Sequence, residues 1–150
     1  MSKFALVFFL TLLAFSAEAQ TYSVTDGRAI KFFEEGENFL YLKRYPEALQ
    51  KFQAAWERSK TFFEAYQKGT QLLITQGKLT EAEALIGKGK SAVLPVKNQY
   101  AVDFAWLLSS IYLKQGRFED ASQEFQIVEK GATEGFKKGS YFLEMKERVD

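Results

Sequence analysis

The residues best placed to do chemistry are the carboxylates of a short acidic cluster, Glu34, Glu35 and Glu37. On a helix Glu34 and Glu37 would share one face, because they are three positions apart, and such a pair could act as a general base or hold a cation. The sequence contains no histidine and no cysteine, which removes the usual general base, the thiolate nucleophile and the common metal ligands. A solvated helix face is the far more frequent reason for such a cluster. We therefore expect no catalytic residue, no metal site and no cofactor.

A repeated turn indicates the elements that carry these side chains. Residues 115–121 read QGRFEDA and residues 76–82 read QGKLTEA, while residues 42–48 read LKRYPEA, a weaker copy with proline near the helix start. Proline is tolerated there because the first helical N–H has no partner in the helix. The alanines that end these stretches are separated by 34 and 39 residues. A period near 34 with one helical hairpin in each unit predicts a solenoid of stacked hairpins.

Apolar residues at helical spacing predict the individual helices, which we place at 29–43, 46–59, 61–76, 80–94, 119–130 and 136–148, with one more before Gly116. The hairpins are expected to bury a shared seam through Ala48, Ala82 and Ala121. Residues 97–101 exceed the period, so they either lengthen a loop or add a turn to the next helix.

Local signals predict how several of these helices begin and end. Asp26 is a good N-cap, and Gly77 is expected to end its helix in the left-handed conformation. Thr80 and Glu83 have the spacing of a capping box. Gly36 lies on an inward face, which predicts close approach of a neighbouring helix, since glycine inside a helix otherwise costs about 1 kcal/mol.

The N-terminus resembles a signal peptide over residues 1–19. Lys3 precedes an apolar run from Phe4 to Phe15, and small residues lead to a cleavage site between Ala19 and Gln20. A retained anchor is the alternative, but this run is shorter than the roughly 20 residues that span a bilayer. We therefore expect an exported protein, periplasmic or extracellular, with no membrane span after cleavage. Residues 20–28 are expected to form an N-terminal arm that is loose over residues 20–25.

Composition limits the partners. The formal net charge is +1, and basic and acidic residues are interspersed, so nucleic acid is not an expected partner. Without cysteine the exported chain must rely on an apolar core, which a content of 47% hydrophobic residues allows.

The repeated pattern resembles the tetratricopeptide repeat (TPR). Three units can be framed at 29–62, 63–96 and 102–135. The small residue of the first helix is matched by Gly36, Thr70 and Ser109, and the second-helix pattern of Ala, Phe, Ala is complete in the first unit as Ala48, Phe52 and Ala55. The resemblance implies an all-α, right-handed solenoid of three hairpins, followed by a C-terminal capping helix over 136–150.

In this family the first helices line a concave groove that contacts a partner segment. Carried over by position, the partner-binding residues would be Phe33, Glu37, Leu40, Tyr41, Gln67, Lys68, Gln71, Trp106, Ser110 and Leu113, and the same face also includes Glu34, Asp103 and Leu107. The alternative is that the apolar members of this set, Phe33, Tyr41, Trp106 and Leu113, pack against the arm, the extra residues or the end helix.

Family members that grip the carboxylate of chaperone tails use a clamp of Lys, Asn and Arg. The matching positions here are Phe33, Glu37, Lys68, Asp103 and Leu107, of which one is basic and two are acidic. A clamp for chaperone tails is therefore not expected.

The sequence thus favours a non-catalytic scaffold or adaptor, in the bacterial envelope or secreted, that binds a protein or peptide segment of unknown identity. Self-assembly into a homo-oligomer, through stacked ends or through the groove, is the alternative. An enzyme using Glu34 and Glu37, for example on glycans, is the least favoured hypothesis.

Overall fold

The computed structural model describes residues 21–150; residues 1–20, with the predicted signal peptide and its cleavage site at Ala19 and Gln20, lie outside the described residues. Within residues 21–150 every regular element is a helix. The helices are α2 (Gly27–Tyr41), α3 (Tyr45–Arg58), α4 (Phe63–Thr75), α5 (Leu79–Val93), the 3₁₀ helix η1 (Asn98–Tyr100), α6 (Ala101–Lys114), α7 (Phe118–Gly131), α8 (Glu134–Lys137) and α9 (Ser140–Val149).

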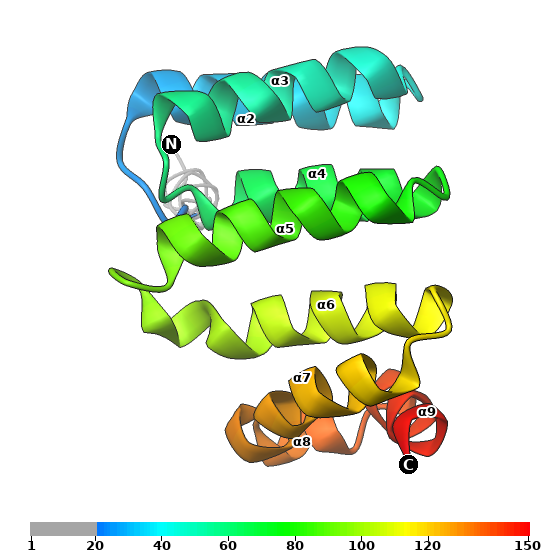
Figure 1. Ribbon diagram of the computed structural model, residues 1–150. Coiled ribbons are helices and arrows are strands. Elements are labelled where there is room, and N and C mark those ends of the chain that lie inside the picture. Colours follow the sequence, from blue (N-terminus) through cyan, green and yellow to red (C-terminus); the bar gives the residue numbers. More distant parts are fainter. Residues whose placement is uncertain (1–20) are drawn as a thin grey trace, which may run out of the picture.

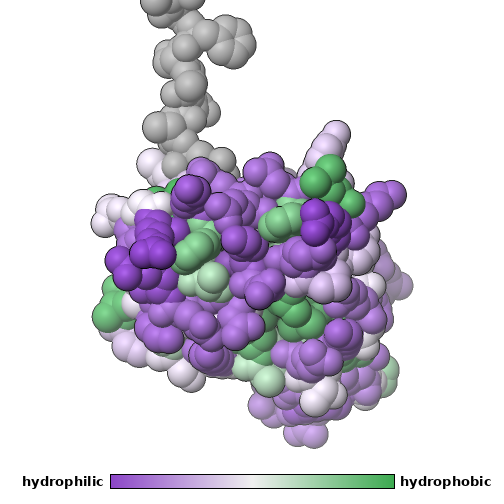
Figure 2. Space-filling model, turned by 90° about the horizontal axis from the view of Figure 1, so that it is seen from above, coloured by the Kyte–Doolittle hydropathy of each residue, from purple (hydrophilic) through white to green (hydrophobic). Residues whose placement is uncertain are grey.

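Three antiparallel hairpins, α2–α3, α4–α5 and α6–α7, are stacked in chain order (Figure 1). Each hairpin packs on the next, so α3 contacts α4 and α5 contacts α6, while α8 and α9 lie at the far end against α6 and α7. This is the all-α solenoid that the period predicts. Seen from the α2–α3 end, the surface is mostly hydrophilic, with small, separated hydrophobic groups (Figure 2).

Small residues hold the hairpins together. Ala48, Ala82 and Ala121 are fully buried, which confirms the predicted seam. A Cβ atom on Gly36 would lie 2.6 Å from the ring of Phe52, so the glycine is required for the approach of α3 to α2.

The turns between paired helices share one backbone conformation. Gly77 and Gly116 have φ angles of 73° and 75°, as expected for left-handed C-terminal caps, and Lys43 takes the same role with φ 57° in the turn that lacks glycine. A side chain is strained in this conformation, so the first turn is the least favourable of the three.

One predicted cap is confirmed and another is wrong. The Asp26 carboxylate accepts hydrogen bonds from the N–H groups of Arg28 and Ala29, both at 3.0 Å. In contrast, α5 begins at Leu79, so Thr80 lies inside the first turn and forms no cap. Glu83 instead accepts hydrogen bonds from Arg117, at 2.9 Å, and from Gln115, which joins the second hairpin to the third.

The expected single end helix is two helices. The chain leaves α8 after Lys137 and is extended at Gly139, with φ −70° and ψ 143°, before α9 begins. Of the extra residues 97–101, Asn98–Tyr100 form η1 and Ala101 begins α6. The Tyr100 ring stacks on Phe63 with centroids 4.1 Å apart.

The core has two parts. A large cluster runs from α2 to α6, and a smaller one forms between α6, α7 and α9 around Ala105, Phe125, Val128 and Phe142. Helix α6 contributes Leu107 to the first cluster, while its Trp106 packs at the edge of the second. The border between the clusters therefore runs along α6.

Candidate binding groove

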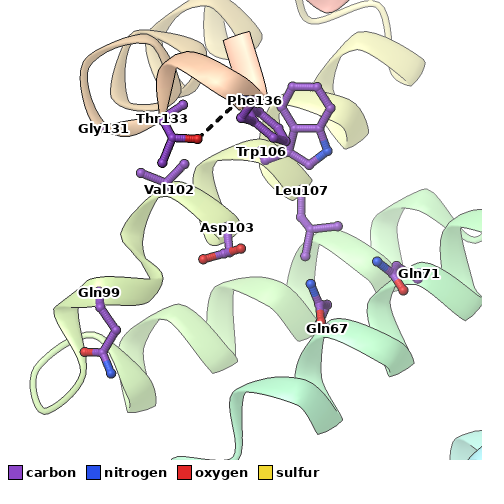
Figure 3. Close-up of a pocket in the computed structure, with 11 residues that line it drawn as sticks. Gln67, Gln71, Gln99, Val102, Asp103, Trp106, Leu107, Gly131, Thr133 and Phe136 are labelled. Atoms are coloured by element: carbon purple, nitrogen blue, oxygen red, sulfur yellow. Dashed lines mark hydrogen bonds between the residues drawn. The ribbon is translucent and has the colours of Figure 1, made fainter. Parts of the chain in front are cut away.

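A groove of about 470 Å³ lies along this border, between α4 and α6, and is closed at one end by α8 (Figure 3). Its lining residues are Gln67, Gln71, Gln99, Val102, Asp103, Trp106, Leu107, Gly131, Ala132, Thr133 and Phe136. The volume and the mixture of apolar and polar side chains are those of a ligand site in proteins generally.

Two aromatic rings form the apolar wall. Trp106 is half-buried and meets the ring of Phe136 edge to face, with centroids 5.2 Å apart and planes at 80°. Phe125 supports Trp106 from the core at 6.4 Å. The side chain of Phe136 is exposed although it is large and apolar, because α8 carries it over the groove instead of into the core. Thr133 fixes the start of α8 by accepting a hydrogen bond from the Phe136 N–H at 3.3 Å.

The opposite side of the groove is polar. The amides of Gln67 and Gln71 come from α4, and the carboxylate of Asp103 comes from the first turn of α6 (Figure 3). Asp103 forms no ion pair within residues 21–150. The Asp103 side chain is exposed, yet the surrounding walls of the groove remove part of its hydration, and this desolvation raises the pKa of Asp103.

Two further hollows adjoin the groove, one beyond Gln71 and one beyond Trp106 and Phe136. One shares Gln71 and is lined by Leu40, Tyr41, Lys43, Tyr45, Lys68, Leu72 and Thr75. The other shares Trp106 and Phe136 and is lined by Ser110, Lys114, Tyr141, Glu144, Met145 and Arg148. The three hollows form one track across the molecule, and Trp106 stands where two of them meet.

The N-terminal arm covers the other part of the concave face. Tyr22 lies edge to face against Phe33 and Phe62, with ring centroids 5.4 and 5.9 Å away. Its hydroxyl donates to Glu34 at 3.3 Å. Burial and the neighbouring carboxylate of Glu34 raise the pKa of Tyr22 to about 12. The prediction of a loose arm is therefore wrong for residues 21–25.

Hydrogen bonds complete the docking of the arm. Ser23 donates its backbone N–H and its hydroxyl to the Glu64 carboxylate, at 2.9 and 2.5 Å, and its hydroxyl oxygen accepts from the Phe63 N–H at 3.0 Å. Lys97 donates to the Ser23 carbonyl oxygen and, at 3.1 Å each, to the carbonyl and hydroxyl oxygens of Thr61. One serine and one lysine thus tie the arm to the start of α4 and to the segment before η1.

Two predicted partner-binding residues are buried instead. Phe33 is 1% exposed among Tyr22, Phe52 and Phe62, and Leu113 is 4% exposed. The arm covers Phe33, while α6 is enclosed by α5, α7 and α9, so more than one face of it is buried. Neither side chain can reach a partner in this structure.

The other predicted positions, except Glu37, lie along the track. Gln67, Gln71 and Trp106 line the main groove. Leu40, Tyr41 and Lys68 line one flanking hollow and Ser110 lines the other. Tyr41 is 87% exposed, so the alternative that it packs against another segment does not hold among the described residues.

The acidic cluster has structural partners. Glu34 accepts from Tyr22, Glu35 pairs with Lys51 at 2.6 Å, and Glu37 pairs with Lys68 at 3.2 Å. The hydrogen bond from Lys51 lowers the pKa of Glu35. Within residues 21–150 no group of three or more potential ligands could hold a metal ion. These carboxylates hold the arm and the first two hairpins in place.

Sequence reasoning missed one wall of the groove. Phe136 was assigned to the end helix, and Thr133 and Val102 to the two ends of the last repeat. Gln99 was assigned to the extra residues 97–101. The spacing of Gly131, Gly135 and Gly139, which interrupts helical propensity, is the signal that could have indicated a folded-back short helix.

In the part of the chain that the structure describes, no helix is both long enough and apolar enough to cross a membrane.

No model of a known protein family matches the chain, and no curated protein matches it. Among solved structures, the first TPR of Spaghetti (RPAP3), bound to the HSP90 peptide SRMEEVD, is similar with a TM-score of 0.67 and 12% sequence identity. The match covers 84% of this chain and 96% of that chain. At this identity the likeness establishes the fold, which is that of a TPR domain, as the repeated pattern predicts.

Proposed function

We propose that this chain is a non-catalytic scaffold that binds an extended segment of another protein in the groove between α4, α6 and α8. The observation that carries the proposal is Trp106, a half-buried ring that stands with Phe136 beside polar groups in an otherwise packed solenoid. Tryptophan in a partly formed pocket is the residue type that most often dominates binding energy at protein interfaces.

The spacing of the polar groups fits an extended segment. Gln67 and Gln71 are four residues apart on α4, so their amides are separated by about 6 Å along the helix axis. Two residues of an extended chain span about 6.6 Å. Each amide can both donate and accept, so the two together can pair with alternate peptide groups of one bound strand. Neither side chain forms a hydrogen bond with another described residue that would compete.

The partner differs in chemistry from the peptide of the similar structure. That peptide, SRMEEVD, has three acidic residues in its last four. Among the five positions that match the clamp, the only basic residue is Lys68, which is paired with Glu37, and Asp103 adds a negative charge. An acidic tail would therefore meet repulsion in this groove.

We place this scaffold outside the cytoplasm, in the bacterial envelope or secreted. The support is the sequence pattern of residues 1–19, with its basic start, apolar run and small residues before Gln20. Expression in a bacterium followed by mass measurement of the exported protein tests this. A mass that corresponds to a chain starting at Gln20 is expected, and an uncut chain in the membrane fraction contradicts it.

Selection of binding peptides tests the function. Random peptides displayed on phage are panned against the purified protein, and the affinity of selected synthetic peptides is then measured by calorimetry. Trp106→Ala is expected to weaken binding by roughly 30-fold or more, the loss typical of a hot-spot residue. Phe118→Ala removes another exposed ring, at the start of α7 and outside the groove, and is the matched control.

Peptides that bind Trp106→Ala as tightly as the unchanged protein would move the binding site elsewhere. Failure to select any peptide over background would contradict the proposal itself.

Self-assembly is a second candidate, favoured by the exposed apolar residues of α9. Tyr141 and Leu143 are 79% and 54% exposed at one end of the solenoid, whereas the opposite end is mostly hydrophilic (Figure 2). Burial of this end would therefore pair two copies and would not build a filament. Sedimentation velocity at micromolar concentration separates the possibilities: a dimer that Leu143→Glu dissociates supports this candidate, and a monomer rules it out.

A further inference from the structure

We infer that the groove holds a lysine or arginine side chain of the bound segment, placed between the carboxylate of Asp103 and the rings of Trp106 and Phe136. This inference rests on the proposed function and adds the chemistry of the occupant.

Charge in the groove is uncompensated. Asp103 is the one charged side chain among the described residues that line the main groove. Two lysines of the adjoining segments are already engaged, because Lys68 pairs with Glu37 and Lys97 binds the oxygens of Ser23 and Thr61. A carboxylate that has lost part of its hydration gains most from a cation that arrives with the ligand.

The aromatic wall suits a cation as well. Asp103 and Trp106 are three residues apart on α6, so they lie on the same face of the helix, and both line the groove. A cation close to the face of a tryptophan ring is attracted by the negative charge of the ring face, and arginine is the cation most often found there. The ring of Phe136, which comes from α8, limits the space beside the Trp106 ring.

The same arrangement already occurs three times within this molecule. Arg44 lies over the ring of Phe39, at 4.8 Å from its centroid, and pairs with the Glu47 carboxylate at 2.6 Å. Arg117 lies over Tyr112 at 4.3 Å and pairs with Glu83 at 2.9 Å.

The third example uses lysine. Lys51 lies 5.6 Å from the centroid of the Phe32 ring and pairs with Glu35 at 2.6 Å. In all three the chain supplies carboxylate, ring and cation. In the groove it supplies a carboxylate and two rings, and the cation is what the bound segment would bring.

Peptide selection on charge variants tests this inference. The panning described above is repeated on Asp103→Asn and Asp103→Lys, with Glu81→Gln, an exposed carboxylate at the start of α5, as the matched control. The unchanged protein and the control are expected to enrich peptides with lysine or arginine at one fixed position. That enrichment should disappear with Asp103→Asn, and Asp103→Lys should favour aspartate or glutamate there.

A double-mutant cycle then measures the contact directly. Replacing the basic residue of a selected peptide by glutamine should weaken binding to the unchanged protein by about tenfold, as for loss of a charge-assisted contact. The same replacement should have little effect on binding to Asp103→Asn, and circular dichroism confirms that this variant is folded.

The outcomes separate the inference from the function on which it rests. The inference is overturned if the selected peptides need Trp106 for binding but share no basic residue. It is also overturned if their basic residue contributes as much to binding of Asp103→Asn as to binding of the unchanged protein. Either result leaves the groove as the binding site. Peptides that ignore Trp106, or the absence of any binding peptide, overturn both.

Discussion

The two halves of the concave face contrast sharply, although they are built from the same repeat. In the first half the chain's own arm covers the face. Tyr22 packs on Phe33, and Ser23 donates two hydrogen bonds to the Glu64 carboxylate. In the second half the corresponding surface carries Trp106 and Asp103, a ring that is half-buried and a carboxylate without an ion pair among residues 21–150.

This contrast indicates how the repeat is used. A single tetratricopeptide-like frame offers aromatic and polar side chains on every first helix, and what matters is whether an intramolecular segment covers them. The covered half contributes to stability, and the open half carries the groove that we propose as the binding site. Four substitutions test this difference between the covered and the open half. The first is expected to change stability the most and the last the least.

Phe33→Ala should cause the largest loss of stability. The side chain is fully buried between the arm and the first hairpin, so its removal leaves a cavity and should lower the free energy of unfolding by about 3–5 kcal/mol. Denaturant unfolding followed by circular dichroism measures the change. Tyr41→Ala, at an exposed position of the same helix, should stay within about 0.5 kcal/mol. Equal losses for the two variants would mean that the arm does not cover Phe33.

Trp106→Ala should cost less stability than Phe33→Ala despite removing a larger ring. Part of the indole already contacts solvent in the groove, so the expected loss is roughly 1–2 kcal/mol. The same unfolding experiment gives the value. A loss as large as that of Phe33→Ala would show that Trp106 is a core residue and would remove the distinction between the two halves.

Lys97→Met should loosen the arm while the solenoid stays folded. The variant keeps the apolar stem of the side chain but loses the hydrogen bonds to Ser23 and Thr61, which should weaken arm docking by roughly 1 kcal/mol. Faster hydrogen exchange at the Ser23 N–H is the measurement. Lys88→Met, at an exposed position of α5, is the control and should leave this exchange unchanged.

Asp103→Asn should change how stability depends on pH. Because the pKa of Asp103 is raised in the folded protein, the unfolded chain loses this proton first as the pH rises, and the folded state becomes less stable between the ordinary and the raised pKa. The asparagine variant lacks this loss, so its stability relative to the unchanged protein should increase as the pH rises from the ordinary aspartate pKa, about 4, to the raised pKa of Asp103. Denaturant unfolding at several pH values tests it. A stability difference that does not vary with pH would show that the groove does not desolvate this carboxylate.

Much of the architecture could be predicted from local signals. The period of about 34 residues, the alanine seam and the left-handed glycine at position 77 each depend on residue type at fixed short spacing. The helix cap at Asp26 is equally local, because its carboxylate binds N–H groups two and three residues away. The three hairpins followed from these features, and the side on which Gln67, Gln71 and Trp106 lie followed from the resemblance to the tetratricopeptide repeat.

The use of the concave face was decided by tertiary structure. Ser23 meets Glu64 across 41 residues, Lys97 meets Ser23 across 74, and the wall at Phe136 depends on how the chain folds back after α7. Glu83 shows the same limit, since its sequence context predicts a local cap while its actual partner, Arg117, belongs to the next hairpin. Helix formation, turns and caps are set within a few residues along the chain, whereas the choice of which surface stays open depends on contacts between segments far apart in sequence, which no short-range pattern encodes.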